Sequence, residues 1–167
     1  MGCRRPSGQA LNGFDEYRLA WHVAATGTAA GVYRGERIDH VIERRSAFTR
    51  RASFDGMRAV SHTLAANVDV VFVVHALGAP PSPRRLEREL VLAFDSGAEP
   101  VVVVTKTDLV ETPSEATDRA REGAPYCDVL AVSATTGEGI GAMENLLSPG
   151  TTAVLLGPSG VGKSTLA

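Results

Sequence analysis

The sequence is poor in cysteine, lysine and aromatic residues, and it contains no long apolar run. Its 167 residues include only two cysteines, Cys3 and Cys127, which lie too far apart to form a metal knuckle. Two isolated thiols are typical of a reducing compartment, so we expect a cytoplasmic protein. No apolar run reaches the roughly 18–20 residues of a membrane span, and residues 1–10 precede no secretory apolar core. We therefore expect neither a membrane protein nor a metal-knuckle protein.

Lysine is rare in a chain that otherwise uses arginine. The sequence holds fifteen arginines but only two lysines, Lys106 and Lys163, and each stands inside a candidate nucleotide-binding motif. A compact ammonium reaches sites that a fork-shaped guanidinium does not fit. The two lysines therefore mark candidate functional positions.

The net charge of −2 hides an asymmetry between the two parts of the chain. Residues 1–60 hold ten arginines against six acidic residues, whereas residues 61–167 hold seven basic against thirteen acidic residues. An arginine-rich front favours contact with an anionic partner such as RNA, and a solvated surface accounts equally well for an excess of this size.

The pattern of apolar residues predicts two regions. Residues 1–60 are expected to form a small and incomplete β-rich module, in which residues 32–41 are a strand pair that turns at Gly35. Residues 61–167 are expected to alternate strands, at 68–76, 101–104, 129–132 and 153–156, with helices. Such alternation is typical of an α/β protein with a doubly wound parallel sheet.

Three helices are predicted between these strands. Leu86, Leu90, Ala93 and Phe94 lie on one helical stripe, and Gly97 is placed to end that helix. Residues 112–115 match a capping box with proline at the first helical position, and residues 140–147 are the third helix.

Residues 157–164 match the phosphate-loop pattern G-x-x-x-x-G-K-[ST] directly after an apolar strand. The glycines allow backbone N–H groups to converge on phosphate oxygens, Lys163 would reach the β and γ phosphates, and Ser164 would ligate Mg²⁺. The motif alone does not distinguish ATP from GTP. The candidate phosphate-binding residues are Gly157, Pro158, Ser159, Gly160, Val161, Gly162, Lys163, Ser164 and Thr165.

Two shorter motifs provide the expected base specificity. The carboxylate of Asp108, in Thr105-Lys106-Thr107-Asp108, can accept hydrogen bonds from N1–H and the 2-amino group of guanine, a donor pair that adenine lacks. Lys106 would lie along the base, and Thr105 stands where the usual pattern has asparagine and keeps one polar contact. In Ser133-Ala134, the Ala134 N–H would meet guanine O6. All three motifs follow predicted strands, so the ends of a parallel sheet would bring them together.

The histidines suggest no catalytic or metal site. His22, His40, His62 and His75 have no metal-ligand spacing and no evident carboxylate partner in the sequence, so we expect structural or surface roles. The sequence indicates no nucleophile elbow and does not identify the residue that would position an attacking water.

The order of these motifs resembles that of the circularly permuted small ribosomal subunit biogenesis GTPases, the RsgA family. The resemblance spans roughly residues 32–167 and includes residues 44–51 and 64–69 with the three motifs above. It implies two parts: a partial OB-like, arginine-rich module at 1–60, and the N-terminal part of a circularly permuted P-loop GTPase domain, with its parallel sheet, at 61–167. It also implies GTP or GDP with Mg²⁺, GTP hydrolysis, and the 30S subunit and its rRNA as partners. We expect a monomer.

The chain departs from the family pattern at both ends. Residues 1–30 do not resemble the opening strands of the barrel, and the switch segments, the D-T-P-G stretch and the zinc module of the family would follow Ala167. We therefore expect a chain truncated after the phosphate loop, without the zinc site, in which residues 152–156 form an exposed apolar edge. Such a chain is expected to bind nucleotide weakly and to hydrolyse little of it.

Two alternatives remain open from the sequence. One is an ATP-using P-loop protein, in which Asp108 has no role in base recognition. The other is a degenerate fragment without catalysis that keeps at most RNA or subunit contact through its arginine-rich front.

Overall fold

A computed structural model describes residues 17–24, 27–34, 37–41, 43–51, 61–78 and 82–167. The chain divides into two compact units, Met1–Asn67 and Val68–Ala167. The expected turn at Gly35 and the start of the chain lie outside the described residues, as do the side chains of His22, His40 and His62. Within the described part, no helix has the length and apolar character needed to cross a membrane.

The first unit is built from antiparallel strands, as the sequence predicts. Strands β1 (Tyr17–Ala24), β2 (Gly27–Arg34) and β3 (Arg37–Val41) form a sheet in that order, and β4 (Ala47–Arg51) pairs with β5 (Ser61–Ala66). Strand β1 was not expected, because its residues show no sustained alternation of apolar and polar side chains. The assignment of an OB fold stays a prediction.

Asn67 fastens the segment before β4 to the end of β5. Its backbone φ of 55° lies in the left-handed region, which asparagine enters more readily than most residues. Its side-chain oxygen accepts a hydrogen bond from the Arg45 N–H at 2.7 Å, and its amide nitrogen donates to the Glu43 carbonyl at 3.0 Å. The asparagine in the family-like segment 64–69 thus has a local structural role.

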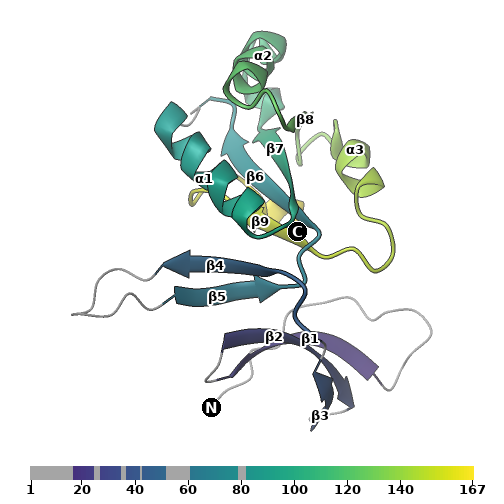
Figure 1. The fold of residues 1–167 in the computed structure, drawn as a ribbon. Helices are drawn as coiled ribbons and strands as arrows, with labels where there is room; N and C mark the ends of the chain where they lie inside the picture. The colour runs from purple at the N-terminus through teal and green to yellow at the C-terminus, as the bar shows by residue number, and fades with distance from the viewer. Residues whose placement is uncertain (1–16, 25–26, 35–36, 42, 52–60, 79–81) are drawn as a thin grey trace. The chain divides into compact units, whose positions relative to one another are not determined.

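The second unit is an α/β layer with a parallel sheet, which confirms the predicted fold class. Strands β6 (Val70–Ala76), β7 (Glu99–Thr105), β8 (Asp128–Val132) and β9 (Ala153–Leu156) lie in the order β8-β7-β6-β9, and every neighbouring pair is parallel (Figure 1). Within the described residues β9 pairs only with β6, so it is an edge strand, as expected.

Apolar residues on both faces of the sheet form the core. On one face Phe72, Val74 and Val103 pack with Met143 and Val161, which brings α3 (Ile140–Asn145) and the phosphate loop against the strands. The other face carries Val73 and Val102, which the two-residue alternation of strands turns away from that cluster. Both faces of β6 and β7 are therefore buried, as is usual for central strands of a parallel sheet.

The helices follow the predicted order, with two corrections. Helix α1 (Pro83–Asp95) buries Leu86, Leu90 and Ala93, but Phe94 is 51% exposed, so its place on the apolar stripe was wrong. It lies next to Ala93 at the rim of the stripe, where the helix is about to end. Helix α2 (Pro113–Gly123) begins after Thr112 as expected, yet the Thr112 side chain makes no capping hydrogen bond. The proline at the first position fixes this helix start without the capping box.

Asp69 ties the amino ends of three strands together. Its N–H donates to the Thr152 carbonyl at 2.8 Å, its carbonyl accepts from the Glu99 N–H at 2.8 Å, and its carboxylate accepts from the Thr152 N–H at 2.8 Å. The residue before β9 is thus held by both the backbone and the side chain of the residue before β6.

Asp69→Ala is expected to lower the free energy of unfolding by about 1–2 kcal/mol, because the Thr152 N–H loses its acceptor. Asp69→Asn keeps a carbonyl oxygen at that place and is expected to lose less than half as much. Urea denaturation followed by circular dichroism measures both. Equal losses would show that the hydrogen bond to Thr152 is not what the side chain contributes.

Candidate functional site

The three predicted motifs meet at one edge of the sheet. Strands β7, β8 and β9 are parallel and end at Thr105, Val132 and Leu156, where the three motifs begin (Figure 1). Carboxyl ends of parallel strands lie on the same side, which is where open α/β sheets bind ligands. The topology therefore assembles segments that are up to 60 residues apart in the chain.

Glycine shapes the start of the phosphate loop. The φ of Gly157 is 153°, and a Cβ built there would lie 2.2 Å from the Val74 carbonyl oxygen, so only glycine fits beside β6. Lys163, at the start of α4 (Lys163–Leu166), donates to the carbonyls of Gly157 at 2.9 Å and Pro158 at 2.5 Å. An ammonium carries three N–H donors, so one remains for a ligand while two hold the loop closed.

Two side chains of the T-K-T-D segment bind consecutive carbonyls of the phosphate loop. The Thr105 hydroxyl donates to the Val161 carbonyl at 2.6 Å, and Lys106 Nζ donates to the Gly160 carbonyl at 2.8 Å. Thr105 is buried, and the φ of Lys106 is 62°, a left-handed conformation that turns the chain sharply at the end of β7. These bonds join the motif expected to read the base to the loop expected to hold the phosphates.

Asp108 and Ser133 form the second link of the site. The Ser133 hydroxyl donates to Asp108 Oδ1 at 2.6 Å and accepts from the Thr136 N–H at 3.1 Å. Asp108 is exposed while Ser133 is fully buried, so the serine holds one oxygen of a carboxylate that solvent can reach. Gly139 lies at the end of this loop, at a position that only glycine fits, because a Cβ there would lie 2.1 Å from the Ala131 carbonyl oxygen.

The remaining predicted residues lie around the same edge. Ala134 and Thr165 line one hollow of about 430 Å³ together with residues of α3, which places the Ser133-Ala134 loop beside the residues that follow the phosphate loop. Ser159, Gly160 and Ser164 are exposed, Val161 is buried in the core cluster, and Pro158 and Gly162 are half-buried. The hydroxyl of Ser164 is therefore accessible to a ligand.

Thr107, the variable residue of T-K-T-D, carries a buried hydroxyl with no hydrogen-bond partner in the structure. The residue is 4% exposed. An unpaired buried hydroxyl destabilises a fold by about 1–3 kcal/mol relative to one that is bonded. The sequence does not single out Thr107, because the motif allows any residue at its position.

Thr107→Val is expected to raise the free energy of unfolding by about 1 kcal/mol, because an apolar methyl replaces the unpaired hydroxyl. Thr117→Val is the matched control: Thr117 is equally buried, but its hydroxyl donates to the Pro113 carbonyl at 2.7 Å, so this change should be destabilising. Urea unfolding of the two variants gives the comparison. A stability loss in Thr107→Val would contradict the assignment of an unpaired group.

His75 has a carboxylate partner, which corrects the expectation drawn from the sequence. Its Nε2 lies 2.6 Å from Glu89 Oε2, and Glu89 Oε1 accepts from Arg85 Nε at 3.1 Å. The partner lies fourteen residues away on α1, so only the packing of that helix on β6 brings the two together. Burial lowers the pKa of the His75 imidazole from its ordinary value of 6.5, while the Glu89 carboxylate acts in the opposite direction.

The lowered pKa of His75 predicts a loss of stability in acid. Between the folded and unfolded pKa values the unfolded chain binds more protons, so this stabilisation is complete above pH 6.5 and is lost as the pH falls through the folded value. We expect the urea midpoint of the wild type to fall more than that of His75→Gln between about pH 7.5 and about pH 5.5. Parallel pH profiles for the two proteins would contradict the prediction.

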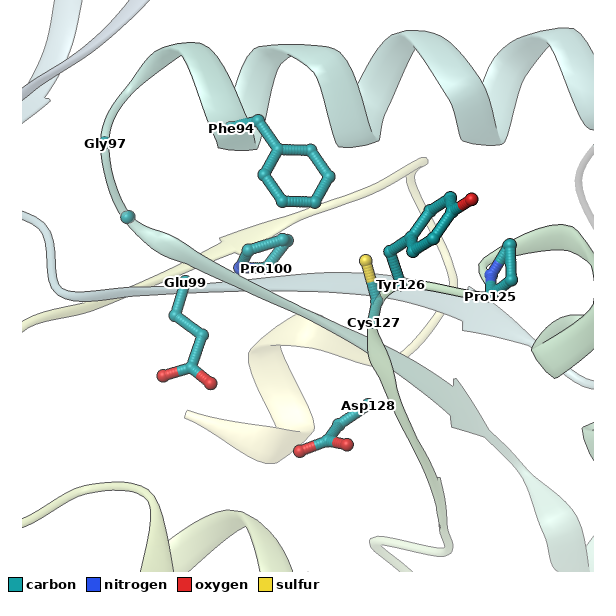
Figure 2. A pocket seen from close by; sticks show the side chains of 9 residues that line it. Phe94, Gly97, Glu99, Pro100, Pro125, Tyr126, Cys127 and Asp128 are labelled. Carbon is teal, nitrogen blue, oxygen red and sulfur yellow. The ribbon is translucent and has the colours of Figure 1, made fainter.

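Another hollow of the second unit lies away from the predicted motifs. It has a volume of about 680 Å³ and is lined at the amino ends of β7 and β8 by residues that include Phe94, Tyr126 and Cys127 (Figure 2). Burial and the neighbouring Asp128 raise the pKa of the Cys127 thiol, which disfavours the reactive thiolate. No group of three or more potential metal ligands occurs among the described residues.

Comparison with known proteins agrees with the motifs. The family model described as RsgA GTPase matches residues 41–167, which is most of the chain. The chain belongs to the RsgA GTPase family. The match includes the T-K-T-D, Ser133-Ala134 and phosphate-loop segments within a single domain model.

Similar proteins carry the description small ribosomal subunit biogenesis GTPase RsgA. That of Streptomyces avermitilis is 47% identical over 75% of this chain and 34% of its own length, and that of Opitutus terrae is 44% identical over 83% and 37%. The crystal structure of YjeQ from Thermotoga maritima is 27% identical, with a TM-score of 0.61 over 83% of this chain and 48% of that chain. The chain spans about a third of the length of these curated relatives.

Proposed function

We propose that this chain binds guanine nucleotides at the carboxyl edge of its parallel sheet. The observation that carries the proposal is the pair of hydrogen bonds from Thr105 and Lys106 to the carbonyls of Val161 and Gly160. They hold the T-K-T-D segment against the phosphate loop, so one bound nucleotide could contact both.

Base recognition is assigned to Asp108 and Ala134. The Ser133 hydroxyl occupies one side of Asp108 Oδ1, which leaves carboxylate lone pairs for N1–H and the 2-amino group of guanine. Adenine offers no such donor pair and would leave the carboxylate unsatisfied. The Ala134 backbone N–H is assigned to guanine O6, and Lys106 to the face of the base.

Phosphate binding is assigned to residues 157–165, with Lys163 as the cation. Two of its three donors hold the carbonyls of Gly157 and Pro158, and the third is available to the β and γ phosphates. Mg²⁺ fits the residues present, since the exposed Ser164 hydroxyl is a hard oxygen ligand of the kind this ion prefers. When bound, the ion would neutralise charge on the phosphates.

We further propose that the chain acts in small-subunit biogenesis as a GTP hydrolase of its family. The names of the similar proteins support this, as does the arginine excess of residues 1–60, which suits contact with rRNA. We also propose that the protein is a monomer and that it acts in the cytoplasm. The ATP-using alternative requires that Asp108 contribute nothing to affinity.

Competition against a fluorescent GDP analogue tests the site. Unlabelled GDP is expected to displace the analogue from the wild-type chain, and ADP is not. Asp108→Asn should weaken GDP binding by about 10- to 100-fold, because an amide accepts only one of the two guanine donors. The same variant should gain affinity for xanthosine diphosphate, whose O2 accepts a hydrogen bond from the new amide.

Glu111→Gln is the matched control, since it removes an exposed carboxylate three residues further along and should leave GDP affinity unchanged. Preference of the wild type for ADP would rule out a GTPase site. Equal GDP affinity of wild type and Asp108→Asn would exclude Asp108 as the base reader.

A further inference from the structure

The end of β6 supports both halves of the nucleotide site. The Leu77 N–H donates to the Thr105 carbonyl at 2.8 Å, and the Thr105 hydroxyl makes a longer contact with the His75 carbonyl at 3.3 Å. The Val74 carbonyl lies directly against Gly157, where no Cβ would fit. Residues 74–77, which comprise this strand end and the start of the following turn, therefore contact both the T-K-T-D segment and the phosphate loop.

The side chain of His75 joins this strand end to α1, on the face of the sheet away from the cluster of Val74 and Val161. Its ring is 2% exposed and is bonded at 2.6 Å to Glu89 of α1, itself 8% exposed. Arg85, one turn earlier on the helix, holds the second carboxylate oxygen of Glu89 at 3.1 Å. Among the described residues, the charged groups that act on the His75 pKa are Glu89 and Arg85, and its neighbour in the register of β7 is Val104.

We propose that His75 and Glu89 are positioning residues for the nucleotide site, acting through the backbone of residues 74–77. The inference rests on the proposed function and adds to it two residues that would touch no nucleotide. Neither belongs to a motif that indicates nucleotide binding.

The end of β6 has little freedom on the side that faces the proposed nucleotide site. A Cβ on Gly157 would lie only 2.2 Å from the Val74 carbonyl oxygen, and the hydrogen bond from Thr105 to Val161 is short, at 2.6 Å. Loss of the His75–Glu89 bond removes the one polar tie between this strand end and α1 among the described residues. A small shift of residues 74–77 would then separate Lys106 and Asp108 from the phosphate loop, and a site that must contact both base and phosphates would lose affinity.

The test measures GDP affinity and stability separately on the full 167-residue chain. Glu89→Ala is expected to raise the Kd for GDP by about 5- to 20-fold, a size typical of coupling through packed networks. Glu89→Gln keeps a hydrogen-bond acceptor for His75 and should stay within about threefold of the wild type. Glu87→Ala removes an exposed carboxylate from the same helix and should leave the Kd unchanged.

To distinguish positioning of the site from a merely structural role, GDP affinity is measured at urea concentrations where the unfolding curves show each protein to be folded. In that case Glu89→Ala would lower only the unfolding midpoint, and its folded form would bind GDP like the wild type. Coupling gives a further criterion: in a Thr105→Val background, which already lacks the bond to Val161, Glu89→Ala should raise the Kd by less than half as much on a logarithmic scale.

Arg85→Ala provides a milder variant should Glu89→Ala fail to fold, because Arg85 is 44% exposed and its loss leaves the His75–Glu89 bond in place. It should raise the Kd by about two- to threefold. Failure of the wild type to bind GDP would overturn the proposed function. Binding by the wild type with an unchanged Kd in the folded Glu89 and Arg85 variants would overturn this inference alone.

Discussion

The candidate site depends on two hydrogen bonds that join the end of β7 to the loop after β9. The Thr105 hydroxyl and the Lys106 ammonium donate to the carbonyls of Val161 and Gly160, residues that follow them in the chain by more than fifty positions. Because both acceptors are backbone oxygens, the bonds fix the path of the phosphate loop without using the N–H groups that would face a phosphate. The phosphate loop and the T-K-T-D segment are thus held in one arrangement relative to each other.

This arrangement explains why threonine can stand where the usual motif has asparagine. The single hydroxyl proton of Thr105 is donated to the Val161 carbonyl at 2.6 Å, and the same oxygen lies 3.3 Å from the His75 carbonyl. A short hydrogen bond offsets the cost of burying the Thr105 hydroxyl, whereas two positions further the buried Thr107 hydroxyl has no partner among the described residues. Neighbouring threonines in one motif therefore have opposite effects on stability.

Several features were predictable from the sequence because they depend on local chemistry. The nearly continuous apolar run at 68–76, the proline at the first position of α2 and the glycine after α1 each act within a few residues, and each element appears close to where it was expected. Phe94 is an exception: an apolar stripe predicts which face of a helix packs on the sheet, but not how wide a part of that face the sheet covers. Strand β1 lacked a periodic pattern and was missed for that reason.

The amino-acid sequence alone predicts the chemistry proposed for the site: a carboxylate suited to guanine, a lysine and glycines suited to phosphates, and an order of motifs that resembles one permuted family, to which the chain belongs. These are properties of residue type and spacing, which need no coordinates. Which groups touch depends on the folded arrangement, because partners such as Thr105 and Val161, or His75 and Glu89, lie on different elements whose approach is set by the packing of the whole sheet. Spacing along the chain carries no information about those contacts until parallel strands place their carboxyl ends side by side.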